Sequence, residues 1–266
     1  MNRWIAIALA PALAAALLAG CAPAAKTPSP PVISKPATTS VQPSEAATAS
    51  LPTTAAVAPK FPGAAAFSKP AVTNPWYPLT PGTTSVYHGI KDGKASVATF
   101  VVTRETTMVL GVKATVVSDV LTQDGKQVEV TTDYYAQDDT GNVWYFGEST
   151  RKADASGKLT NTEGSWKAGV NGATPGIIMP ADPKVGQTFK QENFRGHAED
   201  NFKIESLTAS VTVPYGSFTG AMHTLEWTPV EPGVIDGKYY AKGVGNVAEA
   251  SVQGPKETSD LVSFTK

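Results

Sequence analysis

Apolar and polar residues alternate along much of the chain after residue 71, with the period of two that is typical of half-buried β-strands. In residues 127–135, Val128 and Val130 fall on one face and Glu129 and Asp133 on the other. No sustained helical period follows residue 71. Enrichment in β-branched and aromatic residues predicts strands at 95–103, 112–117, 127–135, 142–146 and 210–213.

Short turn signals separate the apolar segments. Asp-Gly and Asn-Gly pairs accept the positive φ angles that tight hairpins require. Turns are therefore predicted at 91–94, 124–125, 139–142, 171–172 and 236–237. Together the pattern predicts one all-β domain over residues 71–266, an antiparallel meander of about twelve strands forming an open or closed barrel, with a β-sandwich as the alternative.

Two segments of this domain have weakly similar sequences. Pro78–His88 and Asp182–Gln191 both run from a proline through a glycine into a polar and aromatic strand. Each is expected to open a run of antiparallel strands by turning into the sheet at its glycine. Internal duplication is one interpretation of the pair.

The N-terminus has the pattern of a signal peptide. Arg3 precedes an apolar run from Trp4 to about Leu18, which is short for a membrane-spanning helix. Residues 18–21 read Leu-Ala-Gly-Cys and resemble the lipobox of bacterial lipoproteins. The resemblance implies that residues 1–20 are removed, that Cys21 is lipidated, and that the protein is attached to the cell envelope, at the outer membrane if the cell is Gram-negative.

Residues 21–70 are predicted to be a disordered linker. Residues 22–70 hold ten of the 21 prolines, with Ala, Thr and Ser but little large apolar surface. Residues 1–70 carry five basic side chains and one acid, which leaves 17 basic and 22 acidic residues for 71–266. The predicted domain is therefore mildly acidic.

Three turn-rich segments extend the resemblance to the domain. Pro78–Gly82, Val213–Phe218 and Tyr239–Val247 are similar to patterns in uncharacterised secreted or lipid-anchored bacterial proteins. Those proteins resemble the open β-barrels of lipoprotein carriers. The resemblance implies a barrel fold, although this chain lacks the helices that plug the mouth of a carrier barrel.

Composition and motifs exclude several functions. A net charge of −1 provides no basic excess for binding nucleic acid. The one cysteine is assigned to lipidation, which excludes catalysis by a thiol. The chain also lacks the Gly-x-Ser-x-Gly, Walker-type, His-Glu-x-x-His and dinucleotide-binding signatures. No catalytic residue and no cofactor is firmly implied.

One polar cluster is a candidate metal site. His197 and Glu199 are two residues apart, so they would share one face of a strand. If the strand of His223 lies nearby, two histidines and a carboxylate would provide the ligands that a divalent metal prefers. The alternative is that these are solvated or salt-bridged groups on the faces of strands.

Aromatic residues are the other candidate ligand-binding groups. Adjacent aromatics on a strand point to opposite faces, so a barrel would place one ring of each pair in its lumen. The candidates are Tyr135, Trp144, Trp166, Trp227 and Tyr240. The Gly-rich stretch 164–180 is predicted to be an irregular loop, either a lid or contact surface or a structural cover over the barrel end.

The sequence favours a non-enzymatic envelope lipoprotein. It would bind a lipid or another apolar or amphiphilic small molecule, or a protein partner of the envelope. A metal-binding protein or metal-dependent enzyme using His197, Glu199 and His223 is the second hypothesis, and a structural envelope component is the third.

Overall fold

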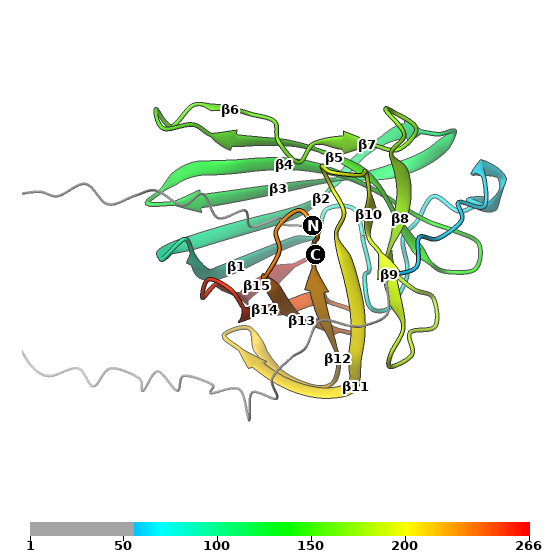
Figure 1. The fold of residues 1–266 in the computed structure, drawn as a ribbon. Coiled ribbons are helices and arrows are strands. Elements are labelled where there is room, and N and C mark those ends of the chain that lie inside the picture. The colour runs from blue at the N-terminus through cyan, green and yellow to red at the C-terminus, as the bar shows by residue number, and fades with distance from the viewer. Residues whose placement is uncertain (1–55) are drawn as a thin grey trace, which may run out of the picture.

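The computed structural model describes residues 56–266 as one antiparallel sheet that curls into a nearly closed barrel (Figure 1). The only helix of this region is the 3-10 turn Ala64–Ala66. The all-β prediction is confirmed. The strands are β1 (Thr84–Lys91), β2 (Lys94–Val109), β3 (Val112–Gln123), β4 (Lys126–Gln137), β5 (Val143–Ala153), β6 (Leu159–Asn161), β7 (Trp166–Lys167), β8 (Thr174–Met179), β9 (Thr188–Lys190), β10 (Glu192–Asn193), β11 (Asn201–Val213), β12 (Gly216–Trp227), β13 (Ile235–Ala241), β14 (Gly245–Gln253) and β15 (Thr258–Thr265).

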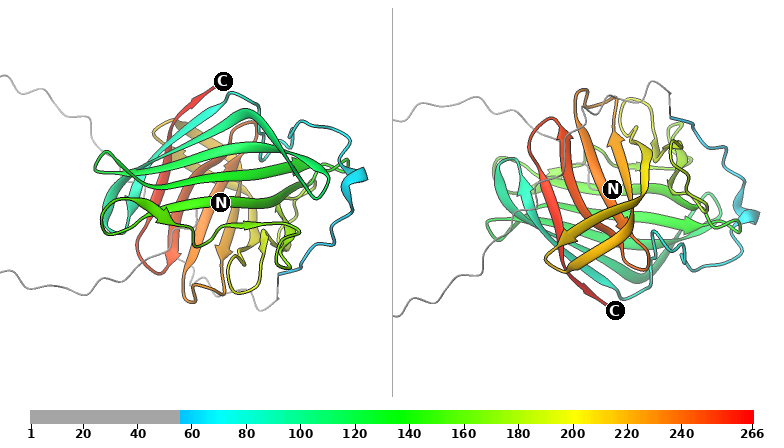
Figure 2. Two further views of the ribbon diagram at one scale, coloured as in Figure 1. Left: turned by 90° about the horizontal axis from the view of Figure 1, so that it is seen from above. Right: turned by 90° about the horizontal axis from the view of Figure 1, so that it is seen from below.

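The strand order is a meander with one long-range junction. It runs β10-β8-β5-β4-β3-β2-β1-β15-β14-β13-β12-β11-β9, with β6 and β7 paired to β5. The first and last long hairpins therefore meet where β1 pairs with β15. Figure 2 shows β2–β5 on one side and β12–β15 on the other, running across one another.

The two ends of this order are joined by the chain itself. β9 pairs with β11 and β10 pairs with β8, and only Gln191 separates β9 from β10. The Gln191 N–H donates to the carbonyl oxygen of Asp200 at 2.7 Å. The six-residue stretch 188–193 thus connects the two edges of the sheet and brings them together in the nearly closed barrel.

The predicted hairpin turns are largely confirmed. Asp92-Gly93 and Asp124-Gly125 have positive φ angles and connect successive strands of the β1–β4 meander. The glycines of the two weakly similar segments also have positive φ, Gly82 before β1 and Gly186 before β9. The turn predicted at 236–237 is wrong, because this pair lies inside β13.

The predicted loop 164–180 contains two strands, β7 and β8. Trp166, Ile177, Ile178 and Met179 are buried in the core. The interpretation as an exposed lid or contact surface is therefore wrong. The glycines that suggested a loop instead allow tight turns and, at Gly176, close contact between backbones.

The packed region starts earlier in the chain than the predicted boundary at residue 71. Phe61 and Phe67 lie against Trp144 and Phe146 of β5, with ring centroids 5.6–6.3 Å apart. Residues 56–70 therefore cover one face of β5. The low apolar content of the linker conceals these two aromatic anchors.

Candidate functional site: a cavity inside the barrel

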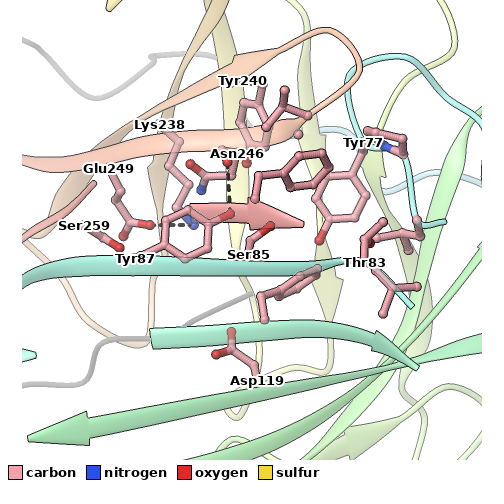
Figure 3. A pocket seen from close by; sticks show the side chains of 17 residues that line it. Tyr77, Thr83, Ser85, Tyr87, Asp119, Lys238, Tyr240, Asn246, Glu249 and Ser259 are labelled. Carbon is pink, nitrogen blue, oxygen red and sulfur yellow. Dashed lines mark hydrogen bonds and ion pairs between the residues drawn. The ribbon is translucent and has the colours of Figure 1, made fainter. Parts of the chain in front are cut away.

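A cavity of about 70 Å³ lies inside the barrel, between β1–β3 on one side and β13–β15 on the other (Figure 3). The segment Tyr77–Leu79, which precedes β1, completes its wall. The lining combines aromatic rings, apolar side chains, hydroxyls and charged groups. Its most informative members are Tyr77, Ser85, Tyr87, Phe100, Asp119, Lys238, Tyr240, Asn246, Glu249, Ser259 and Phe264.

The period of two along each strand brings these residues together. Ser85 and Tyr87 of β1 face the cavity, as do Lys238 and Tyr240 of β13. Residues between them, such as Tyr239, point to the opposite face of the sheet. The pairing of β1 with β15 and of β13 with β14 then places strands from both halves of the chain around one space.

Lys238 is the cation of the cavity wall, and two carboxylates neutralise it. Its Nζ lies 3.0 Å from Glu226 Oε2 and 3.5 Å from Glu249 Oε2, and its side chain is only 5% exposed. Tyr240 Oη and Thr224 Oγ1 both donate to Glu226 Oε1 at 3.0 Å. A buried charge is tolerated only when it is paired in this way. The pair of carboxylates leaves the wall without a surplus positive charge.

Burial raises the pKa of Glu249 to about 7. The nearby charges of Asp236 and Glu226 act in the same direction, whereas Lys238 opposes them. Glu249 is therefore a carboxyl group that changes charge near neutral pH.

Two carboxylates flank the same phenol. Burial raises the pKa of Tyr87, and the charges of Asp119 and Glu249 raise it further. Tyr87 Oη donates to the backbone oxygen of Asn246 at 3.0 Å. Within the part of the chain that the structure describes, the buried Asn246 Oδ1 accepts no hydrogen bond.

The segment before β1 is held in place from both sides. The Gly243 N–H donates to the carbonyl oxygen of Pro75 at 2.8 Å, and Lys242 Nζ lies 4.8 Å from the centroid of the Trp76 ring. Asn74 Nδ2 donates to the backbone oxygens of Gly141 and Pro180, each at 3.0 Å. These contacts fix the position of Tyr77 over the cavity.

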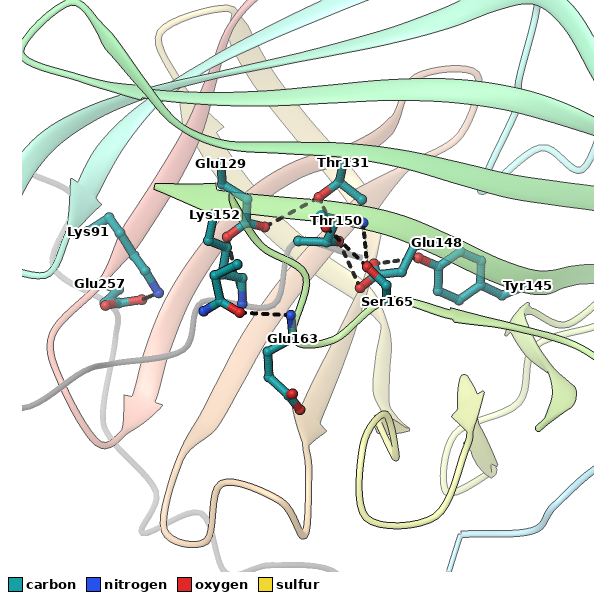
Figure 4. A network of polar contacts seen from close by, with 11 residues as sticks. Lys91, Glu129, Thr131, Tyr145, Glu148, Thr150, Lys152, Glu163, Ser165 and Glu257 are labelled. Atoms are coloured by element: carbon teal, nitrogen blue, oxygen red, sulfur yellow. Dashed lines mark hydrogen bonds and ion pairs between the residues drawn. The ribbon is translucent and has the colours of Figure 1, made fainter. Parts of the chain in front are cut away.

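A second polar cluster lies on β4 and β5 (Figure 4). Tyr145 Oη is 2.5 Å from Asp133 Oδ1 and 2.8 Å from Glu148 Oε2. A phenol has one proton to donate, so one of the two carboxyl groups must itself hold a proton. Burial raises the pKa of Glu148 to about 7, and the charge of Asp133 also raises it. Its raised pKa makes Glu148 a carboxyl group that is protonated below about pH 7 in the folded protein.

Stacked tyrosines connect the second cluster to the cavity. The Tyr145 ring stacks on Tyr135 at 4.7 Å, and Tyr77 lies 5.5 Å from Tyr135. The hydroxyls of Tyr77 and Tyr135 are hydrogen-bonded to each other. The interior is thus a continuous assembly of tyrosines and carboxyl groups.

The structure places one of the five predicted aromatic ligands in the cavity wall. Tyr240 lines the cavity. Tyr135, Trp144 and Trp166 are buried in the core and do not line the cavity, and Trp227 is half-buried at the end of β12. A binding role for these four residues stays a prediction.

The predicted metal ligands are not gathered into a site. His197 lies in the turn before β11 with its ring 4.5 Å from that of Phe194, whereas His223 stacks on Tyr239 at 4.5 Å. Glu199 accepts from the N–H of Gly196 and pairs with Lys190. Within residues 56–266, no group of three or more His, Cys, Asp or Glu side chains is arranged to hold a metal ion. The side chains of His197, Glu199 and His223 do not converge, because residue 197 lies in the turn before β11 and not on a strand.

Sequence reasoning missed the charged residues of the wall. Asp119, Lys238 and Glu249 each stand in a strand among apolar residues, where a charge on the core-facing side is costly. That conflict is the signal that indicates a lined interior. The sequence alone does not show which face of each strand is inside.

Comparison with known proteins gives little further information. No family model and no curated protein matches the chain. Two solved structures are similar. An exported protein described as having a YmcC-like fold, from Bacteroides fragilis, has 16% identity and a TM-score of 0.42, with 72% of this chain and 99% of that chain covered. A lipoprotein from Parabacteroides distasonis has 16% identity and a TM-score of 0.40, with 71% and 98% covered. TM-scores this low carry no information about what this chain binds or does.

In residues 56–266, no helix has the length and apolar character needed to cross a bilayer. The predicted signal peptide, residues 1–20, and the predicted lipidation site Cys21 lie outside the described residues.

Proposed function

We propose that the protein is a non-enzymatic, lipid-anchored protein of the cell envelope that binds a small amphiphile inside its barrel. The observation that carries the proposal is the cavity, which joins apolar and aromatic groups to a few convergent polar ones. That combination is typical of small-molecule sites. The lipobox resemblance at residues 18–21 supports an extracytoplasmic location with Cys21 as the anchor.

The size of the cavity limits the ligand. A cavity of about 150 Å³ holds one benzene molecule, and this cavity has about half that volume. The buried ring of Tyr135, 5.5 Å from that of Tyr77, fills neighbouring interior space. The cavity would therefore hold a small molecule or one end of a larger molecule, but not a whole lipid.

Native mass spectrometry of the full chain tests the proposal. Wild-type protein is expected to retain a small molecule that denaturation releases. Ser85→Leu, which puts extra volume into the cavity, is expected to lose it. Thr84→Leu is the matched control, because Thr84 points to the opposite face of β1.

Two results would contradict the proposal. One is wild-type protein that retains nothing and is stabilised by no small amphiphile, since a ligand of the folded state must raise its stability. The other is a Ser85→Leu variant that retains the molecule as well as wild type does.

A further inference from the structure

We infer that the cavity recognises the ammonium group of a small organic amine. The inference rests on the proposed function, that the cavity is a ligand site, and it specifies the chemistry of the group that binds there. It is carried by the balance of charge and of hydrogen-bonding groups in the wall.

The wall is richer in negative charge than in positive charge. Asp119 and Glu249 each contribute a carboxylate, and Lys238 contributes the one cation of the lining. That cation already lies within 3.5 Å of both Glu226 and Glu249. An anionic ligand would meet two carboxylates flanking Tyr87, whereas a cation would be attracted to them.

The hydrogen-bonding groups of the wall also suit an ammonium group. A primary ammonium group has three N–H donors and no acceptor. The carboxylates of Asp119 and Glu249 and the hydroxyl of Ser85 line the cavity and can each accept one of these bonds.

The aromatic rings favour the same ligand. Tyr77, Tyr87, Phe100 and Tyr240 line the cavity. A cation over the face of such a ring is attracted by the partial negative charge of that face, most strongly when it is desolvated. Leu79 and Val102 provide an apolar surface for a short alkyl chain.

Three probes of one size test the inference on the full chain. Calorimetry compares propan-1-amine, propan-1-ol and sodium propanoate at pH 7.5, with the matching buffer as blank. The amine is expected to bind about tenfold more tightly than the alcohol, a difference of about 1.4 kcal/mol, and the propanoate is expected not to bind. Binding of the amine is expected to disappear in Ser85→Leu.

Variants at two aspartates test whether a carboxylate of the cavity wall binds the ammonium group. Asp119→Asn removes a carboxylate of the wall and is expected to weaken amine binding about tenfold, as for a charge-assisted hydrogen bond. Asp260→Asn is the matched control, because Asp260 follows Ser259 on β15 and points away from the cavity. The comparison of the three probes on wild-type protein needs no variant, so it stands if Asp119→Asn does not fold.

The outcomes separate this inference from the proposed function. If the alcohol or the propanoate binds as tightly as the amine, or if only a retained molecule without an amine is found, the ammonium inference is overturned and the ligand site stands. If the amine binds equally well to Ser85→Leu, it binds elsewhere and the inference also fails. If no probe binds and no molecule is retained, both are overturned.

Discussion

At the scale of single residues, the polar face of several strands is turned into the barrel. On β4, Thr131, Asp133 and Tyr135 are buried, whereas Val128 and Val130 are only half-buried. This inverts the usual orientation of an amphipathic strand, which places its apolar face inside. The buried groups are satisfied by one another, as Asp133 and Glu148 are through the hydroxyl of Tyr145.

The raised pKa of Glu148 predicts a pH-dependent stability. The folded pKa of about 7 lies above the ordinary value of 4.5 for a glutamate carboxyl group, so the folded state binds more protons between these two values. The free energy of unfolding should therefore fall as the pH rises through this window, by up to about 1.4 kcal/mol per unit, and then level off. Glu249 contributes a slope of the same sign.

Glu148→Gln isolates the contribution of Glu148. The amide keeps the acceptor for Thr150 and donates to Tyr145 as the protonated acid does. Urea unfolding should show the variant equal to wild type at pH 5 and about 2 kcal/mol more stable at pH 8. Glu163→Gln, at an exposed site, should change neither value. A Glu148→Gln variant less stable than wild type at pH 8 would contradict the raised pKa of Glu148.

At the scale of elements, local sequence signals identify hairpin turns. They do not identify a glycine that lies within a strand because a neighbouring chain segment approaches it closely. The turn predicted at Asp92-Gly93 is confirmed, and both residues have positive φ angles. Asp236-Gly237 is a similar pair but lies within β13, where His223 Nε2 would be 3.0 Å from a Cβ atom at Gly237. There the glycine makes room for the histidine ring of the neighbouring strand.

Gly176 on β8 is expected to be essential for closing the barrel. A Cβ atom at this position would lie 2.2 Å from the carbonyl oxygen of Gln191, the residue that joins the two sheet edges. Gly176→Ala should therefore separate β10 from β8 and lower the free energy of unfolding by about 2 kcal/mol or more.

Gly216→Ala is the control for Gly176→Ala. Gly216 also lies in a strand, has no positive φ and has open space around its Cβ position. Thermal unfolding should show a change of less than about 1 kcal/mol for this variant. Equal melting temperatures for the two variants would contradict the account of closure at Gln191.

At the scale of the whole molecule, the barrel is completed by segments outside the meander. Residues 188–193 connect the two edges of the sheet, and residues 56–70 cover β5. On the outer face of β5, Trp144 and Phe146 pack against Phe61 and Phe67. On the inner face, Tyr145 packs against Tyr135. All three aromatics of the run 144–146 are buried for this reason.

Removing the covering rings should destabilise the barrel. Phe67→Ala is expected to lower the free energy of unfolding by about 2 kcal/mol, less than for a fully buried ring because Phe67 is partly exposed. Urea unfolding followed by tryptophan fluorescence measures this change, since Trp144 lies beside the ring. Val185→Ala, at an exposed site, is the control. Equal stability of the two variants would show that residues 56–70 do not hold β5.

The sequence by itself determined the fold class, the positions of β2–β5 and part of β11, and most of the turns that were predicted. These follow from local physics, because a strand shows its period and a tight turn needs residues that tolerate positive φ. The N-terminal signal and the anchor at Cys21 are also sequence-based predictions, and they lie outside the described residues.

Only the tertiary structure decided which face of each strand lies inside, and therefore which residues form a site. Asp119 on β3 is far in the chain from Asn246 and Glu249 on β14, and they meet because β1 pairs with β15. His197 and His223 looked equally suitable in the sequence, but strand bounds and register keep them apart. Register and closure depend on contacts between distant residues, and no local pattern specifies them.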